Sequence, residues 1–533
     1  MILIIGLDGA DWRILDPWIE EGSLPTLAAL KARGRWGKLA STIRPESSIA
    51  WTTFATGVNA GKHGVFGFVA QQPHSYEVTL NTAASIHAPT VWQRAAAAGK
   101  KIALLNVPMT YPPQAIPNGA VVAGMLTPST RSAFAQPPEL RQRLLSAVPD
   151  YVINIEHTGM KLRDFIRATT RAIRARGQAA RWLLQQDDWD VMVAVFTATD
   201  RLQHHTLHLL HPDHPRHNPA EAQRLLPELL AAYQAIDTAI AHLLDDAGPD
   251  ATVILLSDHG FTPAARAFYI NAWLRDHGWL ALKEQPPTQQ SGLWRRLRRH
   301  PGLRRLKNSL PLVRQIRRPP PPAPWLNSID WTHTRAFYSP GGGIRFNIRG
   351  REPQGIVEAN EIDALTKALT EALHDAGPFI ANIYAREELY EGPWLASAPD
   401  LIVEPMREGR ADQNAILRND FSSQHLGASG ELTGNHAYAG ILLAAGPGIA
   451  PFDPAENPAI VSARLLDMAP TILHLLELPV PAGMDGRALD FVKGDAASTR
   501  DSAVAPSPET AAAGLSDEDQ HIIQERLRSL GYL

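Results

Sequence analysis

The feature that most restricts the fold is a series of short, almost wholly apolar runs, each bounded by a polar or acidic residue. Helical stretches such as LPELLAAYQAIDTAIAHLLDDA separate several of them. Continuous apolar strands that alternate with helices indicate a mainly parallel sheet covered on both faces. The sequence therefore predicts an α/β fold, with a mainly parallel central sheet sandwiched by helices. The runs span Met1–Asp8, Lys101–Pro108, Asp190–Asp200, Ala251–Gly260, Asp400–Pro405 and Ala439–Gly448.

The composition limits the chemistry that the chain can perform. Of the 533 residues, 44% are hydrophobic, which is typical of globular proteins. The formal net charge is -3, which argues against a dedicated nucleic-acid binder. The chain has no cysteine, so a metal site must use His, Asp, Glu and hydroxyl ligands. The start, MILIIGLDGAD, lacks the basic flank and cleavage site of a signal peptide, and no apolar run is long enough to span a membrane. We expect a cytoplasmic protein.

Composition also divides the chain into five segments. We expect the first part of the core over residues 1–275, a basic, proline-rich insertion or cap over 276–330 and the second part of the core over 331–490. Residues 491–514 have the composition of a flexible linker, and residues 515–533 are predicted to form a C-terminal helix. The sequence leaves the oligomeric state open.

The insertion and the tail helix each leave alternatives open. Between Arg295 and Arg318 lie ten Arg or Lys residues and no acid. This segment is either a solvated surface helix with a stiff proline linker, or a peripheral contact for an anionic surface or substrate. The tail carries an apolar stripe that includes Ile523 and Leu527, so we expect it to dock on the body or on a second subunit.

Candidate metal ligands stand at the ends of the predicted strands. One Asp follows each of three strands, and a His lies four residues after one of them, on the same face of a helix. Carboxylate oxygen and imidazole nitrogen are ligands that zinc and manganese accept, and two such ions can clamp the oxygens of a phosphoryl transfer. The six residues are Asp8, Asp200, His204, Asp258, His259 and His436.

The order of these motifs resembles the alkaline phosphatase superfamily and, more narrowly, the type I phosphodiesterase/nucleotide pyrophosphatase family. The segment SSIAWTTFATGVNAGKHGVFGF is similar to that family's nucleophile segment, whose hydroxyl lies nine residues before the Thr of a Thr-Gly pair. Counting back from Thr56 gives Ser47, with Ser48 as its structural neighbour. The family's nucleophile is often Thr, and a Ser preserves the chemistry.

The resemblance implies a division of the ligands between two divalent ions, zinc or else manganese. One ion would be held by Asp200, His204 and His436. The other would be held by Asp8, Asp258, His259 and the Ser47 oxygen. A metal-bound hydroxyl loses its proton more easily, so Ser47 would need no separate base.

The substrate contacts are less defined. Family members that cleave nucleotides carry an Asn 21 residues after the nucleophile, and Phe68 occupies that position here. Asn59 and Lys62 are candidates to replace it, and Arg44 is a further candidate cation. Trp51 and Phe68 are candidates for an apolar wall against the second ester group of a diester.

The sequence therefore predicts a metal-dependent phosphoric ester hydrolase that acts through a phosphoserine intermediate on a small-molecule phosphate ester, as a phosphodiesterase or nucleotide pyrophosphatase. The alternatives are a phosphomonoesterase, or a phosphomutase or phosphotransferase on the same fold, and a non-catalytic binding protein that kept the fold. GVNAGKHG is not a P-loop, because it is one residue too short between the glycines and His63 replaces the Ser or Thr.

Overall fold

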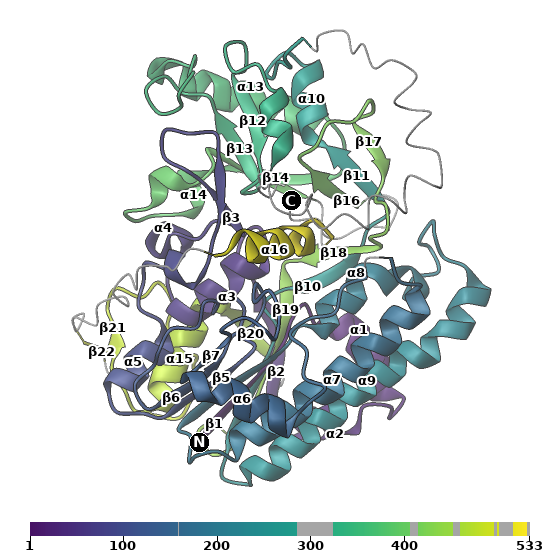
Figure 1. Cartoon of the computed structure of the whole chain (residues 1–533), viewed down its shortest axis with the longest axis vertical. Helices are drawn as coiled ribbons and strands as arrows, with labels where there is room; N and C mark the ends of the chain where they lie inside the picture. Colours follow the sequence, from purple (N-terminus) through teal and green to yellow (C-terminus); the bar gives the residue numbers. More distant parts are fainter. Residues whose placement is uncertain are drawn as a thin grey trace, which may run out of the picture.

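The structure is a computed structural model that describes residues 1–157, 159–284, 323–405, 414–450, 459–494, 498–499 and 515–529. Figure 1 shows a lower body built on a large sheet and an upper lobe built on smaller sheets. The large sheet has nine strands in the order β20-β2-β19-β9-β1-β8-β5-β6-β7. Their bounds are β1 Ile2–Leu7, β2 Arg35–Ala40, β5 Ile102–Leu105, β6 Gly119–Val122, β7 Ala135–Gln136, β8 Val191–Phe196, β9 Thr252–Leu256, β19 Ala439–Ala445 and β20 Ala459–Arg464.

Strand directions confirm the prediction of a mainly parallel central sheet. β9, β1, β8, β5 and β6 are parallel neighbours, with Ile2 of β1 in register with Val191 of β8 and Thr252 of β9. β19 runs antiparallel to both of its neighbours, β9 and β2. The start of β19 therefore lies at the edge where the parallel strands end.

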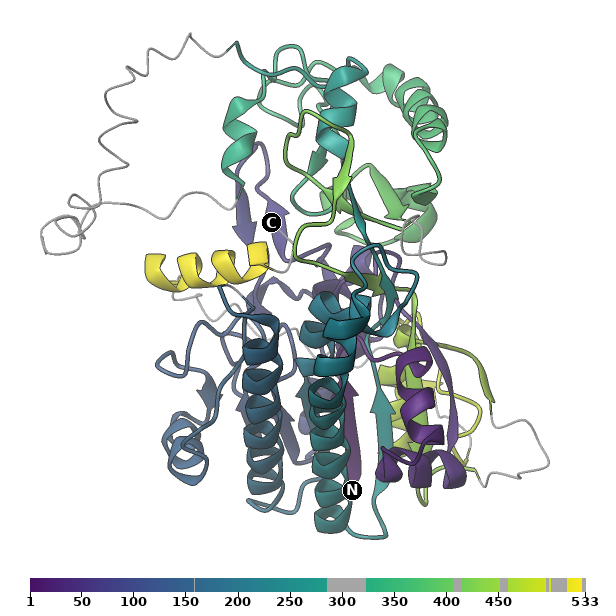
Figure 2. The same ribbon diagram turned by 90° about the vertical axis from the view of Figure 1, so that its right-hand side faces the viewer.

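Helices cover both faces of this sheet, because side chains along a strand point alternately to its two sides. Leu3 and Ile5 of β1 share a core cluster with residues of the helices on one face, and Ile2 and Ile4 share another with helices on the opposite face. Figure 2 shows the long helices α7 and α9 side by side. The first set is α1 Trp12–Glu20, α2 Pro25–Arg33, α6 Pro138–Ala147, α7 Leu162–Leu184, α8 Ala198–Leu210 and α9 Pro219–Ala247; the second is α3 Ser47–Thr56, α5 Val91–Ala97 and α15 Met468–Leu475.

The upper lobe has its own antiparallel sheet and its own core. Four strands, in the order β12-β13-β15-β14, pack with two helices around Phe337, Phe346 and Leu369. The strand predicted over Asp400–Pro405 is present as β15, but it belongs to this antiparallel sheet and not to the parallel one. A second sheet, β16-β11-β17, lies in the same lobe. The bounds are β12 Ala336–Ser339, β13 Gly343–Phe346, β14 Ile380–Ala385, β15 Leu401–Pro405, α10 Ile270–Asp276, α13 Ile362–Asp375, β11 Arg266–Tyr269, β16 Ala415–Arg418 and β17 Leu426–Ala428.

Shorter elements complete the described chain. The basic segment between Arg295 and Arg318 lies outside the described residues, and the five-segment division of the chain stays a prediction. Within the ranges that the structure describes, no helix combines the length and the apolar character needed to cross a bilayer. The remaining elements are α4 Ala60–His63, β3 Val69–Gln71, β4 Val78–Leu80, β10 Gly260–Pro263, α14 Arg386–Leu389, β18 Gly434–Ala437, β21 Val480–Pro481, β22 Ser498–Thr499 and the 3₁₀ turns Ala83–Ser85, Pro324–Ser328, Ala359–Glu361, Leu395–Ser397 and Leu465–Asp467.

The C-terminal helix α16, Asp517–Ser529, lies between the two halves of the molecule (Figures 1 and 2). Its Ile523 and Leu527 are buried in a cluster that includes Phe68 and Met125 of the body. Arg526 forms an ion pair with Glu156 at 2.7 Å. The helix thus docks on the body through an apolar contact that is flanked by a partly buried ion pair.

We expect Leu527→Ala to loosen this docking. Leu527 is 0% exposed, and truncation of a buried Leu to Ala costs about 2–5 kcal/mol through lost burial and the cavity left behind. Hydrogen exchange of α16 peptides should become faster, and the thermal unfolding midpoint should fall. His521→Ala, at an exposed position of the same helix, is the control. Unchanged exchange in α16 for Leu527→Ala would contradict the docking.

Candidate metal centre

Three carboxylates reach one place because they follow three adjacent strands of the sheet. Asp8 comes directly after β1, Asp258 comes two residues after β9, and Asp200 lies in the first turn of α8, after β8. β9, β1 and β8 are neighbours with the same direction, so their carboxyl ends share one edge. This is the edge at which open α/β sheets bind ligands.

His436 reaches the same edge from the far end of the chain. It lies in β18, just before β19, whose start is at this edge. β18 pairs antiparallel with β10, and His436 stands opposite Phe261, two residues after His259. This pairing stacks the His259 and His436 rings with centroids 3.7 Å apart.

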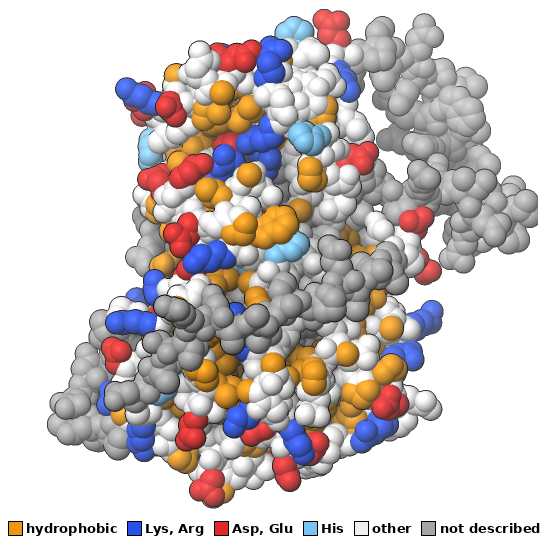
Figure 3. Space-filling model, turned by 90° about the vertical axis from the view of Figure 1, so that its left-hand side faces the viewer, with side chains coloured by type: hydrophobic (Ala, Val, Ile, Leu, Met, Phe, Trp, Pro, Cys, Tyr) orange, Lys and Arg blue, Asp and Glu red, His pale blue; other side chains and the backbone are white. Residues whose placement is uncertain are grey.

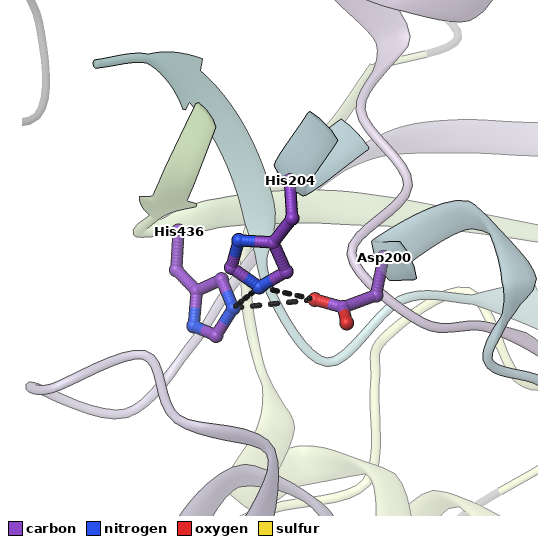
Figure 4. A group of neighbouring side chains, drawn as sticks. All are labelled: Asp200, His204 and His436. Carbon is purple, nitrogen blue, oxygen red and sulfur yellow. Dashed lines mark hydrogen bonds and ion pairs between the residues drawn. The ribbon is translucent and has the colours of Figure 1, made fainter. Parts of the chain in front are cut away.

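The first group consists of Asp200, His204 and His436, all buried. Figure 4 shows both imidazole rings and the carboxylate pointing toward one another. Asp200 Oδ1 lies 3.3 Å from His204 Nε2 and 3.2 Å from His436 Nε2. The two Nε2 atoms are 3.1 Å apart.

The second group consists of Asp8, Asp258 and His259, also buried, with Ser47 beside it. His259 Nε2 lies 3.3 Å from Asp258 Oδ2 and 3.9 Å from Asp8 Oδ1. Ser47 Oγ lies 3.3 Å from the same nitrogen. These two groups have the same protein ligands as the two sets that the family resemblance implies.

Backbone carbonyls fix the tautomer of all three histidines. The Nδ1–H group of His436 donates to the carbonyl oxygen of Pro45 at 2.6 Å, and those of His204 and His259 donate to the carbonyls of Gly434 and Gly260 at 3.2 and 3.1 Å. Each Nε2 lone pair is therefore directed into its group. Metal-ligating histidines commonly have such a partner on the other ring nitrogen.

Burial determines the charge states within the two groups. Burial, together with the nearby Asp258 and Asp200 carboxylates, raises the pKa of Asp8 well above its usual value. Burial likewise raises the pKa of Asp258 to about 7. Burial lowers the pKa of His204 and His259, which favours their neutral rings. Burial opposes the ionisation of Asp200, but His204, His436 and Arg201 lower its pKa.

The residues fit divalent metal ions. One oxygen of each aspartate, Asp8 Oδ1, Asp200 Oδ1 and Asp258 Oδ2, is buried without a hydrogen-bond partner among the described residues. Ligand atoms about 2.0–2.2 Å from a tetrahedral zinc ion lie about 3.3–3.6 Å from one another, close to the separations within the first group. Neutral imidazoles beside unpartnered carboxylate oxygens form a donor set that zinc and manganese accept.

The two adjacent serines have different environments. Ser47 opens helix α3, and its Oγ faces His259. Ser48 Oγ instead donates to Glu46 Oε1 at 2.7 Å. The positive end of a helix dipole favours negative charge at the first of these positions.

The aromatic residues predicted as an apolar wall lie elsewhere. Trp51 is 1% exposed in the core beneath the sheet edge, and its Nε1 donates to Asp8 Oδ2 at 3.1 Å. Phe68 is buried against α16, and its backbone N–H donates to Glu46 at 3.0 Å. Trp51 therefore holds Asp8 in position, and Phe68 holds Glu46 in position.

Asn59 and Lys62 also lie in a structural network. Asn59 Nδ2 donates to Asp485 at 2.8 Å, and Lys62 forms ion pairs with Asp485 and Glu391. Arg44 is the one residue among the predicted substrate contacts that lines the cavity beside the first metal group. Its guanidinium pairs with Glu46 and donates to the carbonyl oxygen of Gly341 at 2.5 Å.

The cavity also contains residues that the sequence did not single out. Its volume is about 310 Å³, and His204 and His436 form part of its wall. The upper lobe contributes Trp325 and Arg418, and α16 contributes Arg528. No motif surrounds these residues, so only the tertiary structure brings them to the site.

Comparison with known proteins agrees with this geometry. The family model of type I phosphodiesterase/nucleotide pyrophosphatase matches residues 2–411, which confirms the resemblance drawn from the sequence motifs. A search of curated proteins finds no match.

Phosphonoacetate hydrolase and the alkaline phosphatase PafA share the fold at low sequence identity. Phosphonoacetate hydrolase from Sinorhizobium meliloti 1021 is 17% identical with a TM-score of 0.53, over 89% of this chain and 95% of that one. The alkaline phosphatase PafA is 13% identical with a TM-score of 0.51, over 92% and 98%. Murine ectonucleotide pyrophosphatase/phosphodiesterase 5 is 14% identical with a TM-score of 0.49, over 92% and 99%.

We expect two divalent ions per chain, one in each group. Elemental analysis of protein reconstituted with zinc should give two ions for the wild type and one for His204→Ala, because that change removes one of the first group's three ligands. His211→Ala, at the end of the same helix and outside both groups, should keep two. Unchanged stoichiometry in His204→Ala would contradict the assignment.

Proposed function

We propose that this chain hydrolyses small phosphoric diesters through Ser47 at a two-metal site. The chain belongs to the type I phosphodiesterase/nucleotide pyrophosphatase family, whose members are hydrolases of the alkaline phosphatase superfamily. The observation that carries the proposal is the convergence of three oriented Nε2 atoms and three buried carboxylate oxygens, which have no hydrogen-bond partner among the described residues, beside the Ser47 hydroxyl. The metals are zinc or manganese.

Divalent ions held by the two groups would lower the pKa of the Ser47 hydroxyl and offset the charge of the phosphoryl oxygens. Ser47 gives up its hydroxyl proton to water and its Oγ attacks phosphorus, the bond to the leaving group breaks, and the leaving oxygen takes up a proton from water to form the alcohol. Because Ser47 opens α3, the positive end of that helix dipole would favour the negative charge that develops there.

A water molecule completes the cycle. It attacks the phosphoserine, the P–Oγ bond breaks and the serine hydroxyl returns, with the phosphoryl product released. Glu46 supports this sequence from behind, because it accepts from Ser48 and from the N–H group of Phe68 and thereby fixes the start of α3.

Ser47→Ala should abolish turnover of bis(p-nitrophenyl) phosphate while the bound metal and the unfolding midpoint stay close to wild type. A single hydroxyl contributes little to stability, whereas the proposed reaction needs it as the nucleophile. Ser48→Ala is the matched control and should retain much more activity, since its hydroxyl faces Glu46. Equal losses in both variants would reject Ser47 as the nucleophile.

The preference for diesters rests on the cations near the nucleophile. A monoester carries one more negative charge on the transferred group, and monoesterases usually add a cationic side chain that stabilises it. Lys62 is paired with Asp485 and Glu391, and Arg44 with Glu46. Both candidate cations are thus already compensated.

We therefore expect a higher kcat/KM for bis(p-nitrophenyl) phosphate than for p-nitrophenyl phosphate under the same metal conditions. A clear monoester preference would contradict this prediction and would favour the alternative of a phosphomonoesterase. Transfer of the phosphoryl group to an added alcohol at the expense of water would favour a phosphotransferase. A binding protein without catalysis would bind metal and turn over neither ester.

Partners and location remain proposals. On the face shown in Figure 3, acidic and basic side chains are interspersed over the described surface, which suits a small-molecule enzyme better than a nucleic-acid binder. Contact of the 295–318 segment with an anionic surface and a cytoplasmic location stay predictions from the sequence.

A further inference from the structure

The cavity beside the first metal group has two walls of different origin. His204, His436 and the Arg44–Glu46 segment belong to the body, while Trp325 and Arg418 belong to the upper lobe. Its volume of about 310 Å³ is at the lower end of the range for small-molecule sites, about 300–1,000 Å³. It therefore has room for one small substrate whose phosphoryl group is at the metal centre.

Three arginines line this cavity, and two of them have acidic partners. Arg44 pairs with Glu46, and Arg528 pairs with Glu525 in its own helix. These pairs leave little net charge for a substrate. The third arginine that lines the cavity, Arg418, is therefore the candidate cation for substrate selection.

Arg418 differs from the other two arginines because it has no acidic partner among the described residues. It ends strand β16 and is partly buried, and its guanidinium makes no hydrogen bond or ion pair with any residue that the structure describes. Asp420 is the nearest acid in sequence, but it is exposed and forms no ion pair with Arg418 in the described structure. Burial lowers the pKa of Arg418, although Asp420 and Tyr269 act against this.

A partly buried guanidinium without a partner is costly unless a ligand supplies an anion. The planar fork of Arg suits a carboxylate or phosphate, to which it donates two parallel hydrogen bonds. A cavity with a metal centre on one wall and such a fork on the other matches a molecule that is anionic at two points.

We propose that Arg418 determines specificity by binding a second anionic group of the substrate, a carboxylate or phosphate attached to the phosphoryl group through a short linker. This inference rests on the proposed function, which places the phosphoryl group of the substrate at the two metal groups. It narrows the substrate class from phosphodiesters in general to esters or anhydrides that carry a further negative charge.

The test compares two inert phosphonates that differ in one group. Propylphosphonate and 2-carboxyethylphosphonate have nearly the same shape, but only the second has a distal carboxylate. Butylphosphonate and 3-carboxypropylphosphonate extend the comparison by one methylene. Calorimetry on the zinc-loaded protein gives their affinities directly, and inhibition of bis(p-nitrophenyl) phosphate hydrolysis gives them a second time.

We expect the wild type to bind the carboxylated member of at least one pair about tenfold or more tightly, the size expected for a charge-assisted bidentate contact. Arg418→Gln should remove that difference and leave the affinity for the plain alkylphosphonate unchanged, which also shows that the variant is folded. Arg418→Lys should keep part of the difference, since it retains the charge but not the fork. Arg266→Gln, an exposed arginine on the neighbouring strand β11, should behave as the wild type.

Equal affinities within both wild-type pairs, or a difference that survives Arg418→Gln, would overturn the inference. These results are separate from a failure of the proposed function. An Arg418-dependent difference in affinity without any turnover of phosphate esters would retain the binding role of Arg418 and reject the hydrolase mechanism.

Discussion

The structure depends on the burial of three carboxylates at one edge of the sheet. Asp8, Asp200 and Asp258 are each at most 2% exposed, and each has an oxygen that no described hydrogen bond satisfies. A buried carboxylate that ionises without a compensating charge is strongly destabilising, so divalent cations in these groups would stabilise the ionised forms of Asp8 and Asp258, whose pKa values burial raises. The surrounding contacts support that conclusion, because backbone carbonyls hold all three histidines with their Nε2 atoms directed inward. Metal binding, folding of the sheet edge and activation of Ser47 are therefore expected to be coupled.

Two long-range contacts hold the reactive groups in register. The pairing of β10 with β18 joins residues 260–263 to 434–437, and it sets His436 beside His259. Glu46 joins the segment that it shares with Arg44 and Ser48 to the backbone of Phe68, and Phe68 in turn packs against α16. Arg44 then reaches the carbonyl of Gly341 in the upper lobe. The nucleophile segment is thus supported by the body, the lobe and the C-terminal helix together.

The sequence pointed to the residues that stand at strand ends or in motifs, and it missed those that only tertiary packing brings to the cavity. Apolar runs that end in Asp identified the sheet edge, and the four-residue offset placed Asp200 and His204 on one face of α8. Asp400–Pro405 was assigned to the wrong sheet, because a run buried on both faces has the same pattern in parallel and antiparallel sheets. Trp51 follows Ser47 by only four residues, yet it points into the core; proximity in sequence does not fix direction. Arg418 lies in no motif, and only the pairing of β16 with β11 brings it to the cavity.

The distribution of charge around the cavity bears on the chemistry more than the number of cations does. Arg44 and Lys62 are compensated by acids, so neither offers a free charge to a doubly ionised phosphoryl group. Arg418, which has no hydrogen-bond or ion-pair partner among the described residues, belongs to the upper lobe and not to the nucleophile segment. Positive charge at the reacting phosphorus lowers the barrier for every ester, whereas positive charge at a distance favours only substrates with a matching group. With the proposed roles of the metal groups and Arg418, the body would supply the chemistry and the upper lobe would select the substrate.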